Sequence, residues 1–537
     1  MTRAALGAPI TGRGKRMNGR IERRSLLLGA LGGGAALAVQ ACIGNSEEAN
    51  AETTSHAESQ NDAGAKSPAD AACKPEAPPA MQEASEWSRK LTAFITGMRD
   101  AELSEDVLEL AKRHVLDTLA AIVACRDLGP AKVGRDFALV QSAGARVAPI
   151  LGTQERAALL DAIFASAMCA HSAEINDYDP SAYVQPGASV VPAALCLGVT
   201  RKVTGAAFLR AFIVGYEISG RLPRALGSRN LSNGVLANHS VGPLFGVAAA
   251  CASLVELPAE RLNHLYSYCV QQASGSWQWL RDVEHIEKGF AFAGMPARRG
   301  TECALLVEAG FTGIGDPFVG KPGWLNSSMF TGKDSDFSPG VLTDDLGSTF
   351  ELPLVGYKRY PVGGPTQSAV QLMLEFLKEL DPKQVKHVRI EMPGRADAFA
   401  SAEMPALNLP YLCSIILIDG KLDFTAAQSR ERFLNDAQVR DFMKNVEVVY
   451  DAGQERTPRV ESARVHLTLE DGSTREAFLE HVKGYPEYPM EREDVQSKAR
   501  ELLTSRLGNA RVDQLVEAVW SLESADSLDA MIDLIAT

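Results

Sequence analysis

Apolar residues recur every three or four positions over much of the chain between residues 87 and 347. The runs at 107–124, 241–254 and 262–275 show this spacing, which is typical of helices that bury one face. Small side chains predominate from Ala248 to Ala252, and they favour close packing of one helix against another. This pattern predicts a large all-helical domain at 86–351.

The pattern changes near residue 350, where apolar and polar residues begin to alternate. Segments 385–392, 445–450 and 462–480 alternate as strands with one buried face do, and Asp471-Gly472 predicts a hairpin turn. Helical spacing returns at 366–380 and after Glu493. The fold class predicted is mostly α: the helical domain, a smaller α+β domain at 352–490, and C-terminal helices at 491–537.

The first 42 residues have the pattern of an export signal. A basic segment that ends in Arg23-Arg24 precedes a glycine-rich, mildly apolar run at 25–41, which is less apolar than a membrane span requires. Cys42 ends the tetrad Val-Gln-Ala-Cys, which is similar to a bacterial lipobox, so it is either lipidated or incidental to simple cleavage nearby. We expect twin-arginine export to the periplasm, with membrane contact only through the N-terminus.

Residues 43–85 are rich in Ala, Glu, Ser, Asn and Pro and contain almost no large apolar side chain. A segment of this composition cannot bury enough surface to offset the entropy of ordering. We therefore expect a disordered linker, which suits a chain tethered at its N-terminus.

Charge and cysteine usage exclude several classes of function. The 537 residues carry a net charge of −13 and show no basic face after the N-terminus, so we expect no nucleic-acid partner. Nine cysteines are scattered without a Cys-x-x-Cys pair, which disfavours a zinc ribbon or an iron–sulfur cluster. Because no nucleotide loop or metal triad is visible either, we expect neither cofactor nor metal.

Candidate chemistry is concentrated at 171–195. His171, Glu174, Asp177, Tyr178 and Asp179 fall within nine residues, between two apolar segments. Acids and a histidine are costly to bury, and such clusters gather where a cleft opens. These residues predict a site for a polar, anionic small molecule.

This stretch resembles the acidic signature of the MmgE/PrpD family, and three further motifs follow in the family's order. Residues 284–313 resemble its lysine segment, 357–367 its K-x-Y-P motif, and 403–412 the segment that carries its tyrosine. The resemblance implies an active site between the two domains, C-terminal helices that return to the helical domain, and a homodimer. It also implies a cofactor-independent lyase or isomerase acting on a small di- or tricarboxylic acid, by dehydration, decarboxylation or epimerisation.

The resemblance implies roles for five residues. Lys288 and Tyr411 match catalytic positions, Lys358 matches a substrate-binding lysine, and Glu174 and Asp177 match acidic positions. Paired carboxylates can orient a catalytic histidine or hold substrate hydroxyls. Each residue also has an ordinary alternative. Lys288 would be a surface lysine, Lys358 part of a plain loop and Tyr411 a core tyrosine. Glu174 and Asp177 would cap the neighbouring helix.

The chain departs from the family pattern at several positions. Gln185 replaces the histidine before the Pro-Gly turn, and glutamine can bind substrate but cannot shuttle a proton. Tyr178 replaces Thr or Val and is expected to contact substrate. His239, displaced by about two residues, is the nearest candidate for the family's second histidine and is otherwise a core histidine; His285 is a further candidate. The alternative function is therefore a catalytically impaired, periplasmic carboxylate-binding lipoprotein.

Overall fold

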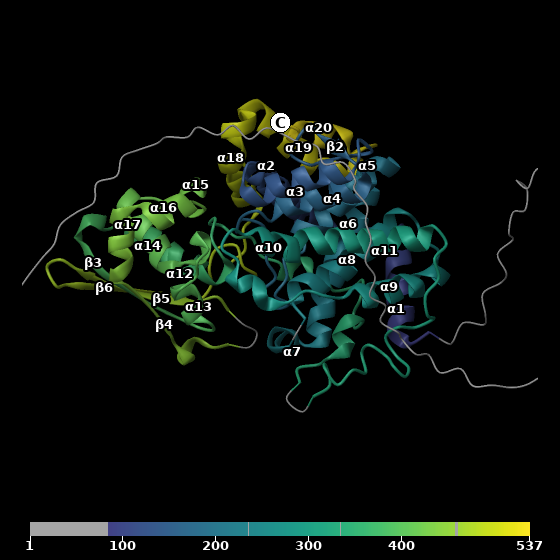
Figure 1. The fold of residues 1–537 in the computed structure, drawn as a ribbon, viewed down its shortest axis with the longest axis horizontal. Coiled ribbons are helices and arrows are strands. Elements are labelled where there is room, and N and C mark those ends of the chain that lie inside the picture. The colour runs from purple at the N-terminus through teal and green to yellow at the C-terminus, as the bar shows by residue number, and fades with distance from the viewer. Residues whose placement is uncertain (1–83, 235, 333–334, 457–459) are drawn as a thin grey trace, which may run out of the picture. The chain divides into compact units, whose positions relative to one another are not determined.

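The computed structural model describes residues 84–234, 236–332, 335–456 and 460–537 (Figure 1). The predicted export signal, Cys42 and all but the last two residues of the predicted linker lie outside these ranges. Among the residues described, no helix is long and apolar enough to cross a membrane.

Helices make up the first domain. They are α1 (Glu86–Gly97), α2 (Glu105–Cys125), α3 (Gly129–Gln141), α4 (Leu159–Ala170), α5 (Gly187–Arg201), α6 (Gly205–Leu226), α7 (Ser228–Asn233), α8 (Asn238–Leu254), α9 (Leu262–Gln272), α10 (Ile286–Gly289) and α11 (Met295–Glu308). A short antiparallel pair, β1 (Ala148–Pro149) and β2 (Arg156–Ala157), lies between α3 and α4.

Helices α6 and α8 pack closely at the centre of this domain, as the small side chains predict. A Cβ atom on Gly246 would collide with the Gly215 carbonyl oxygen, and one on Gly242 would collide with that of Ser219. Backbone approach of this kind leaves no room for a larger side chain. The close backbone contact between the two helices therefore fixes the position of the N-terminal end of α8.

The smaller domain combines helices with a four-stranded sheet. Its elements are α12 (Gln367–Phe376), β3 (Val385–Met392), α13 (Ala396–Ala400), α14 (Leu409–Asp419), α15 (Phe424–Ala427), α16 (Arg430–Asn435), α17 (Ala437–Phe442), β4 (Val446–Tyr450), β5 (Ala463–Leu469) and β6 (Thr474–Leu479).

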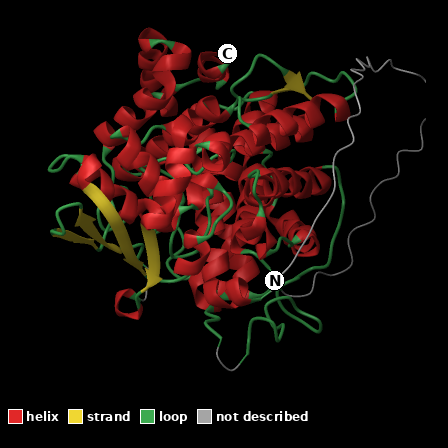
Figure 2. Cartoon of the chain, turned by 60° about the vertical axis from the view of Figure 1, so that its left-hand side comes forward, coloured by secondary structure: helices red, strands yellow, loops and turns green. Residues whose placement is uncertain are grey.

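The strand order is β4-β3-β5-β6, with β3 parallel to β4 and the other pairs antiparallel. The strands lie at one edge of the described region (Figure 2). Alternate residues of β5, from Ala463 to Leu469, are buried and pack against α12, and they share a second hydrophobic core with apolar residues of α12 and α14. The mostly α fold with a smaller α+β domain is confirmed.

The last three helices pack on the first domain: α18 (Arg492–Leu507), α19 (Asn509–Trp520) and α20 (Asp529–Ile535). Helix α18 lies beside α2 (Figure 1), and the two are joined by a buried ion pair of 2.6 Å between Lys498 Nζ and Asp117 Oδ1. Apolar residues of α18 to α20 belong to the core of the helical domain.

The helical prediction extends too far at its C-terminal end. Between Glu308 and Gln367, the described residues form only single 3₁₀ turns, the longest at Pro339–Leu342. Glycine and proline recur throughout this stretch, and both disfavour helix interiors. The strands at 385–392 and 446–450 and the hairpin through Gly472, whose φ is 83°, are confirmed.

Candidate active site

A cavity of about 460 Å³ lies between the helical and the α+β domain. The helical domain supplies its polar groups, Glu174, Tyr178, Gln185, His239 and Lys288, and an aromatic wall of Trp277, Trp279 and Phe292. The smaller domain closes it with Arg395, Phe399 and Leu407. The sequence prediction thus identified five of the residues that line it.

The segment between α4 and α5 is held in place by its own acidic side chains. Asp177 Oδ1 accepts a hydrogen bond from the Gly187 amide at 3.2 Å, and its Oδ2 accepts one from the Tyr216 hydroxyl at 2.6 Å. A Cβ on Gly187 would lie 2.6 Å from the Thr118 and Tyr216 hydroxyl oxygens, which explains the Pro-Gly turn. Asp177 is fully buried and does not line the cavity, and its hydrogen bonds hold the backbone of this segment in place.

Lys288 and Glu174 form a buried ion pair at the deep end of the cavity. The Lys288 ammonium donates to Glu174 Oε1 and lies 4.7 Å from the centroid of the Trp279 ring. Burial alone would raise the pKa of Glu174, but the charges of Lys288 and Lys358 outweigh burial and hold that pKa well below 4.5. The carboxylate is therefore ionised at neutral pH.

The backbone around Lys288 is irregular in two ways. His285, the residue before α10, has a φ of 63°, and α10 is followed by a π-helical turn at Phe290–Gly294. Non-glycine residues seldom adopt such a φ, and π turns are frequent at functional sites. Together they bring Lys288 and Phe292 onto the same cavity wall.

Lys358 lies behind Glu174 instead of on the cavity surface. Its Nζ donates to the carbonyl oxygens of Asn176 (3.0 Å) and Asp177 (3.2 Å) and lies 3.9 Å from Glu174 Oε2. Burial lowers its pKa to about 8. The structure places this predicted substrate-binding lysine behind the cavity wall, in contact with Glu174 and the backbone of the acidic segment.

His239 is the histidine that reaches the cavity. Its ring stacks on Phe292 with centroids 3.8 Å apart, and its buried Nδ1 has no hydrogen-bond partner among the residues described. Burial and the positive charge of Lys288 lower its pKa well below 6.5. At neutral pH the free protein therefore presents an uncharged imidazole beside an ammonium group.

Two further histidines lie behind this wall. His171 Nδ1 is 2.8 Å from Asn176 Oδ1, and His285 Nε2 is 3.6 Å from Glu174 Oε1. Burial lowers the pKa of both. Nitrogen and oxygen atoms of His171, Glu174 and His285 lie within 4.8 Å of one another, as in a metal site. However, the two ammonium groups beside Glu174 disfavour a cation there.

Tyr411 does not reach the cavity. Asn408 caps the start of α14, and the Tyr411 hydroxyl donates to the carbonyl oxygens of Ala426 (2.7 Å) and Ser429 (3.3 Å). The ring is fully buried in the core of the smaller domain. Tyr411 is therefore placed as a core tyrosine whose hydroxyl binds the backbone, which is the ordinary alternative for this residue.

Sequence reasoning did not find Arg395 or the two tryptophans. Trp277 and Trp279 belong to a 3₁₀ helix (Trp277–Arg281), and their spacing of two carried no signal of a cavity wall. Arg395 follows a Pro-Gly turn after β3, a position that looks like an ordinary surface loop. Arg395 becomes a residue of the same cavity as Lys288 only because the two domains approach each other.

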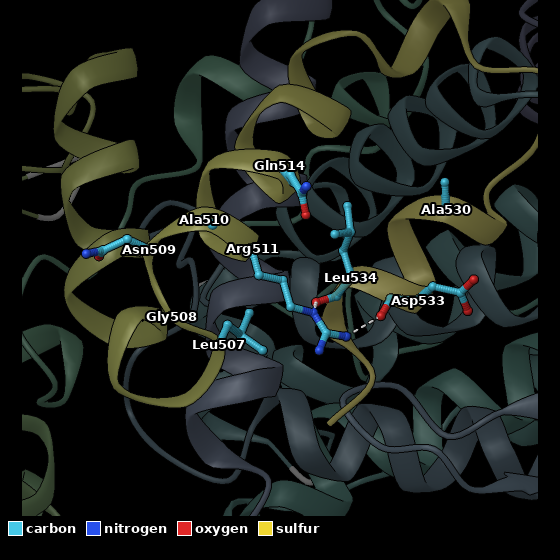
Figure 3. A pocket seen from close by; sticks show the side chains of 9 residues that line it. All are labelled: Leu507, Gly508, Asn509, Ala510, Arg511, Gln514, Ala530, Asp533 and Leu534. Atoms are coloured by element: carbon cyan, nitrogen blue, oxygen red, sulfur yellow. Dashed lines mark hydrogen bonds between the residues drawn. The ribbon is translucent and has the colours of Figure 1, made fainter.

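A second hollow, of about 710 Å³, lies between α19 and α20 (Figure 3). Its polar feature is Arg511, which donates to the carbonyl oxygens of Leu534 (2.8 Å) and Ala536 (2.7 Å). Arg511 thus satisfies backbone groups at the end of the last helix. This hollow contains no acid–base group comparable to those beside Lys288.

Comparisons with known proteins identify the family of this chain. Residues 89–338 match the MmgE/PrpD N-terminal domain, and residues 360–522 match the MmgE/PrpD C-terminal domain. The chain is 24% identical to the cis-aconitate decarboxylase-like protein oryM of Aspergillus oryzae, over 83% of this chain and 96% of that protein.

It is also 24% identical to cis-aconitate decarboxylase of Aspergillus terreus, over 81% of this chain and 92% of that enzyme. Human cis-aconitate decarboxylase is 23% identical, over 82% of this chain and 92% of the human protein. With both domain models matched in order across most of its length, the chain belongs to the MmgE/PrpD family.

Proposed function

We propose that this protein is a cofactor-independent carboxy-lyase acting on a small unsaturated di- or tricarboxylic acid of the cis-aconitate class. The observation that carries the proposal is the Lys288–Glu174 pair facing a neutral, unpartnered His239 in one cavity. The relatives named cis-aconitate decarboxylase favour loss of CO2 over dehydration or epimerisation.

The charges suit a substrate that becomes more negative next to a carboxylate. Two ammonium groups, those of Lys288 and Lys358, lie beside the Glu174 carboxylate at the deep end of the cavity. Aromatic rings surround Lys288, and a cation in such an environment interacts more strongly with an anion than it does in water. Lys288 would hold a substrate carboxylate and stabilise the enolate-like charge that develops beside it.

Decarboxylation of a cis-aconitate-type acid requires the delivery of one proton. The bond between the methylene carbon and its carboxylate breaks, CO2 leaves, and the electron pair forms a new double bond to the central carbon. The original double bond shifts its electrons onto the far carbon, beside a carboxylate, and a proton adds there. The products are CO2 and an unsaturated acid with one carboxylate fewer.

His239 is the group that we propose delivers this proton. Its imidazole is neutral in the free protein because of burial and the nearby Lys288 charge. A bound polycarboxylate adds negative charge beside it, which raises the pKa and favours the imidazolium form. Substrate binding thus favours the protonated form of His239, which then donates its proton to the carbanion of the substrate.

The decisive experiment incubates the full chain with cis-aconitate in D2O and follows CO2 release and products by NMR. We expect a decarboxylated acid carrying one deuteron at the carbon that is protonated. Lys288→Ala should lower kcat by about 100-fold or more, since removing one electrostatic stabiliser in an active site has effects of that size. Lys421→Ala, whose side chain is 70% exposed beyond the end of α14, should leave the rate unchanged.

A carboxylate-binding protein without turnover is the second candidate. Gln185 favours it, since this cavity residue replaces a proton-transferring histidine and its buried Oε1 has no partner in the described part of the chain. Binding of cis-aconitate with neither CO2 release nor deuterium exchange would support it over the lyase. In that case, turnover gained by Gln185→His would identify the missing proton donor.

A further inference from the structure

Arg395 lines the cavity but takes no part in the Lys288–Glu174 ion pair. It stands between a turn at Gly394, whose φ is 72°, and the first residue of α13, and it lines the cavity from the smaller domain. The Gly394 amide donates to Glu455 Oε1 at 2.8 Å, which fixes the turn that precedes the arginine. The other charged residues of the cavity wall, Glu174 and Lys288, belong to the helical domain.

The guanidinium of Arg395 is unpaired. It makes no hydrogen bond or ion pair with any residue that the structure describes. Arginines on neighbouring elements of the same domain are paired, as these three contacts show: Arg389 with Glu447 at 2.7 Å, Arg432 with Asp419 at 2.7 Å, and Arg464 with Glu476 at 2.5 Å. Arg395 therefore keeps all five N–H donors available at the cavity.

Arg395 changes the charge that the cavity offers to a ligand. Of the charged residues that line the cavity, Lys288 and Arg395 are cations and Glu174 is an anion, so Arg395 leaves the lining with one positive charge in excess. The chain as a whole carries −13, so this excess is local. Lys288 is only 3% exposed, whereas Arg395 is exposed, which puts one charge at the deep end and the other at the mouth.

The cavity wall to which Lys288 and Arg395 belong is largely apolar. Phe399 and Leu407 line it from the smaller domain, and Trp279 and Leu280 line it from the helical domain. Such a lining suits carbon atoms, while the two cations suit carboxylates.

We propose that Arg395 binds a second carboxylate of the substrate at the cavity mouth, while Lys288 holds the carboxylate at the reacting end. The site would thus select acids with at least two carboxylates separated by a short carbon chain that bridges the two domains. This inference rests on the proposed function, because it assigns the same cavity to the same class of substrate.

The test measures binding by calorimetry with the full chain and two stable probes. Tricarballylate carries three carboxylates and has no double bond to drive decarboxylation, and butyrate carries one carboxylate. Arg395→Ala should weaken tricarballylate binding about tenfold or more, since a charge-assisted bidentate contact is lost. Butyrate binding should not change, because butyrate needs only Lys288.

Three further variants sharpen the result. Arg395→Lys should restore only part of the affinity, since an ammonium group lacks the planar fork of a guanidinium. Lys288→Ala should weaken both probes. Arg440→Ala is the matched control, because Arg440 is exposed in the same domain, away from the cavity, and should bind both probes as the parent does.

The outcomes separate this inference from the proposed function. If Arg395→Ala binds tricarballylate as tightly as the parent while Lys288→Ala does not, Arg395 is a solvated surface residue and the inference is wrong, but the lyase proposal stands. If the parent binds neither probe, the cavity is not a carboxylate site and both proposals fail together.

Discussion

His239 offers a neutral imidazole to a cavity in which the Lys288 ammonium affects its pKa more than the Glu174 carboxylate does. Burial and Lys288 both lower its pKa, so little imidazolium exists in the free protein above pH 6.5. The direction of that shift has a consequence for rate, because acid and base roles need opposite protonation states. The two roles therefore predict different pH profiles for the same residue.

If His239 donates a proton, kcat/KM should fall as pH rises. The protonated fraction of the free protein declines tenfold per pH unit above the lowered pKa, so we expect about a tenfold fall between pH 6.5 and 7.5. A His239 that removes a proton, as in epimerisation, would instead give a flat profile over this range. Steady-state rates across that range distinguish the two.

His239→Gln supplies the control. It should lower kcat by at least about 100-fold, which is the typical contribution of a positioned acid or base. Any residual pH dependence in this variant reports ionisation of the substrate's own carboxyls. A variant that keeps the parent's rate would remove His239 from the mechanism.

The types of residue in the sequence, together with the family resemblance, were enough to predict many of the residues that line the cavity. Lys288, Glu174, His239, Gln185 and Tyr178 all line the cavity. Charged residues among apolar segments gather where a cleft opens, and resemblance to the family indicated the uncharged ones. Residue type alone does not say which atom faces the ligand. Lys358 and Asp177 carry the same kinds of charge, but their side chains lie behind the cavity wall. Hydrogen bonds with distant segments determine that placement.

Helix α14 explains why the tyrosine prediction did not reach the cavity. The cap at Asn408 sets where the helix begins, and the turn that follows directs Tyr411 toward the backbone of α15 and α16. Its hydroxyl therefore ties three helices together. A motif match cannot reveal such an orientation, since it depends on where the neighbouring short helices return.

Tyr411→Phe should lower stability without lowering activity. It removes a buried hydrogen bond to the Ala426 carbonyl, so we expect a loss of about 1 kcal/mol in the free energy of unfolding. Urea unfolding measures that loss, and kcat with cis-aconitate should stay within about twofold of the parent if the tyrosine only supports the fold.

Tyr360→Phe is the matched comparison. Tyr360 packs against the same core, and its hydroxyl has no hydrogen-bond partner among the described residues. It should therefore leave both stability and rate unchanged. A 100-fold lower kcat for Tyr411→Phe alone would show that Tyr411 reaches the substrate and that our assignment is wrong.

Elements with a strong period were predictable from the sequence, and irregular ones were not. Strand β3 and the β5–β6 hairpin follow from alternation and one Asp-Gly turn. The π-helical turn at Phe290–Gly294 has no such signature, although it places Phe292 beside Lys288. It is a local insertion that tertiary packing stabilises, and a pattern of apolar residues does not distinguish it from ordinary helix.

At the scale of the whole molecule, the last helices stabilise the site that the first helices form. Lys498 on α18 donates to Asp117 Oδ1 on α2 and, at 2.6 Å, to the carbonyl oxygen of Ile175, the residue after Glu174. Lys498 and Asp117 are almost completely buried. Resemblance alone predicted that the C-terminal helices return, because an amphipathic pattern does not say which surface a helix covers.

Lys498→Met should therefore affect both stability and catalysis. Asp117 would be left buried without its cation, and loss of one partner of a buried pair typically lowers the free energy of unfolding by about 3–5 kcal/mol. The Ile175 carbonyl would also lose its donor, so the backbone next to Glu174 should loosen and kcat should fall. Chemical unfolding and steady-state rates measure the two effects.

The double variant Lys498→Met with Asp117→Asn separates charge from packing. Removing both charges should recover most of the stability, because the uncompensated carboxylate is gone. The rate should recover less, since the Ile175 carbonyl still lacks its donor. If kcat returned in full with stability, α18 would stabilise the fold without positioning Glu174, and the acidic segment would owe its geometry to Lys358 and Asp177 alone.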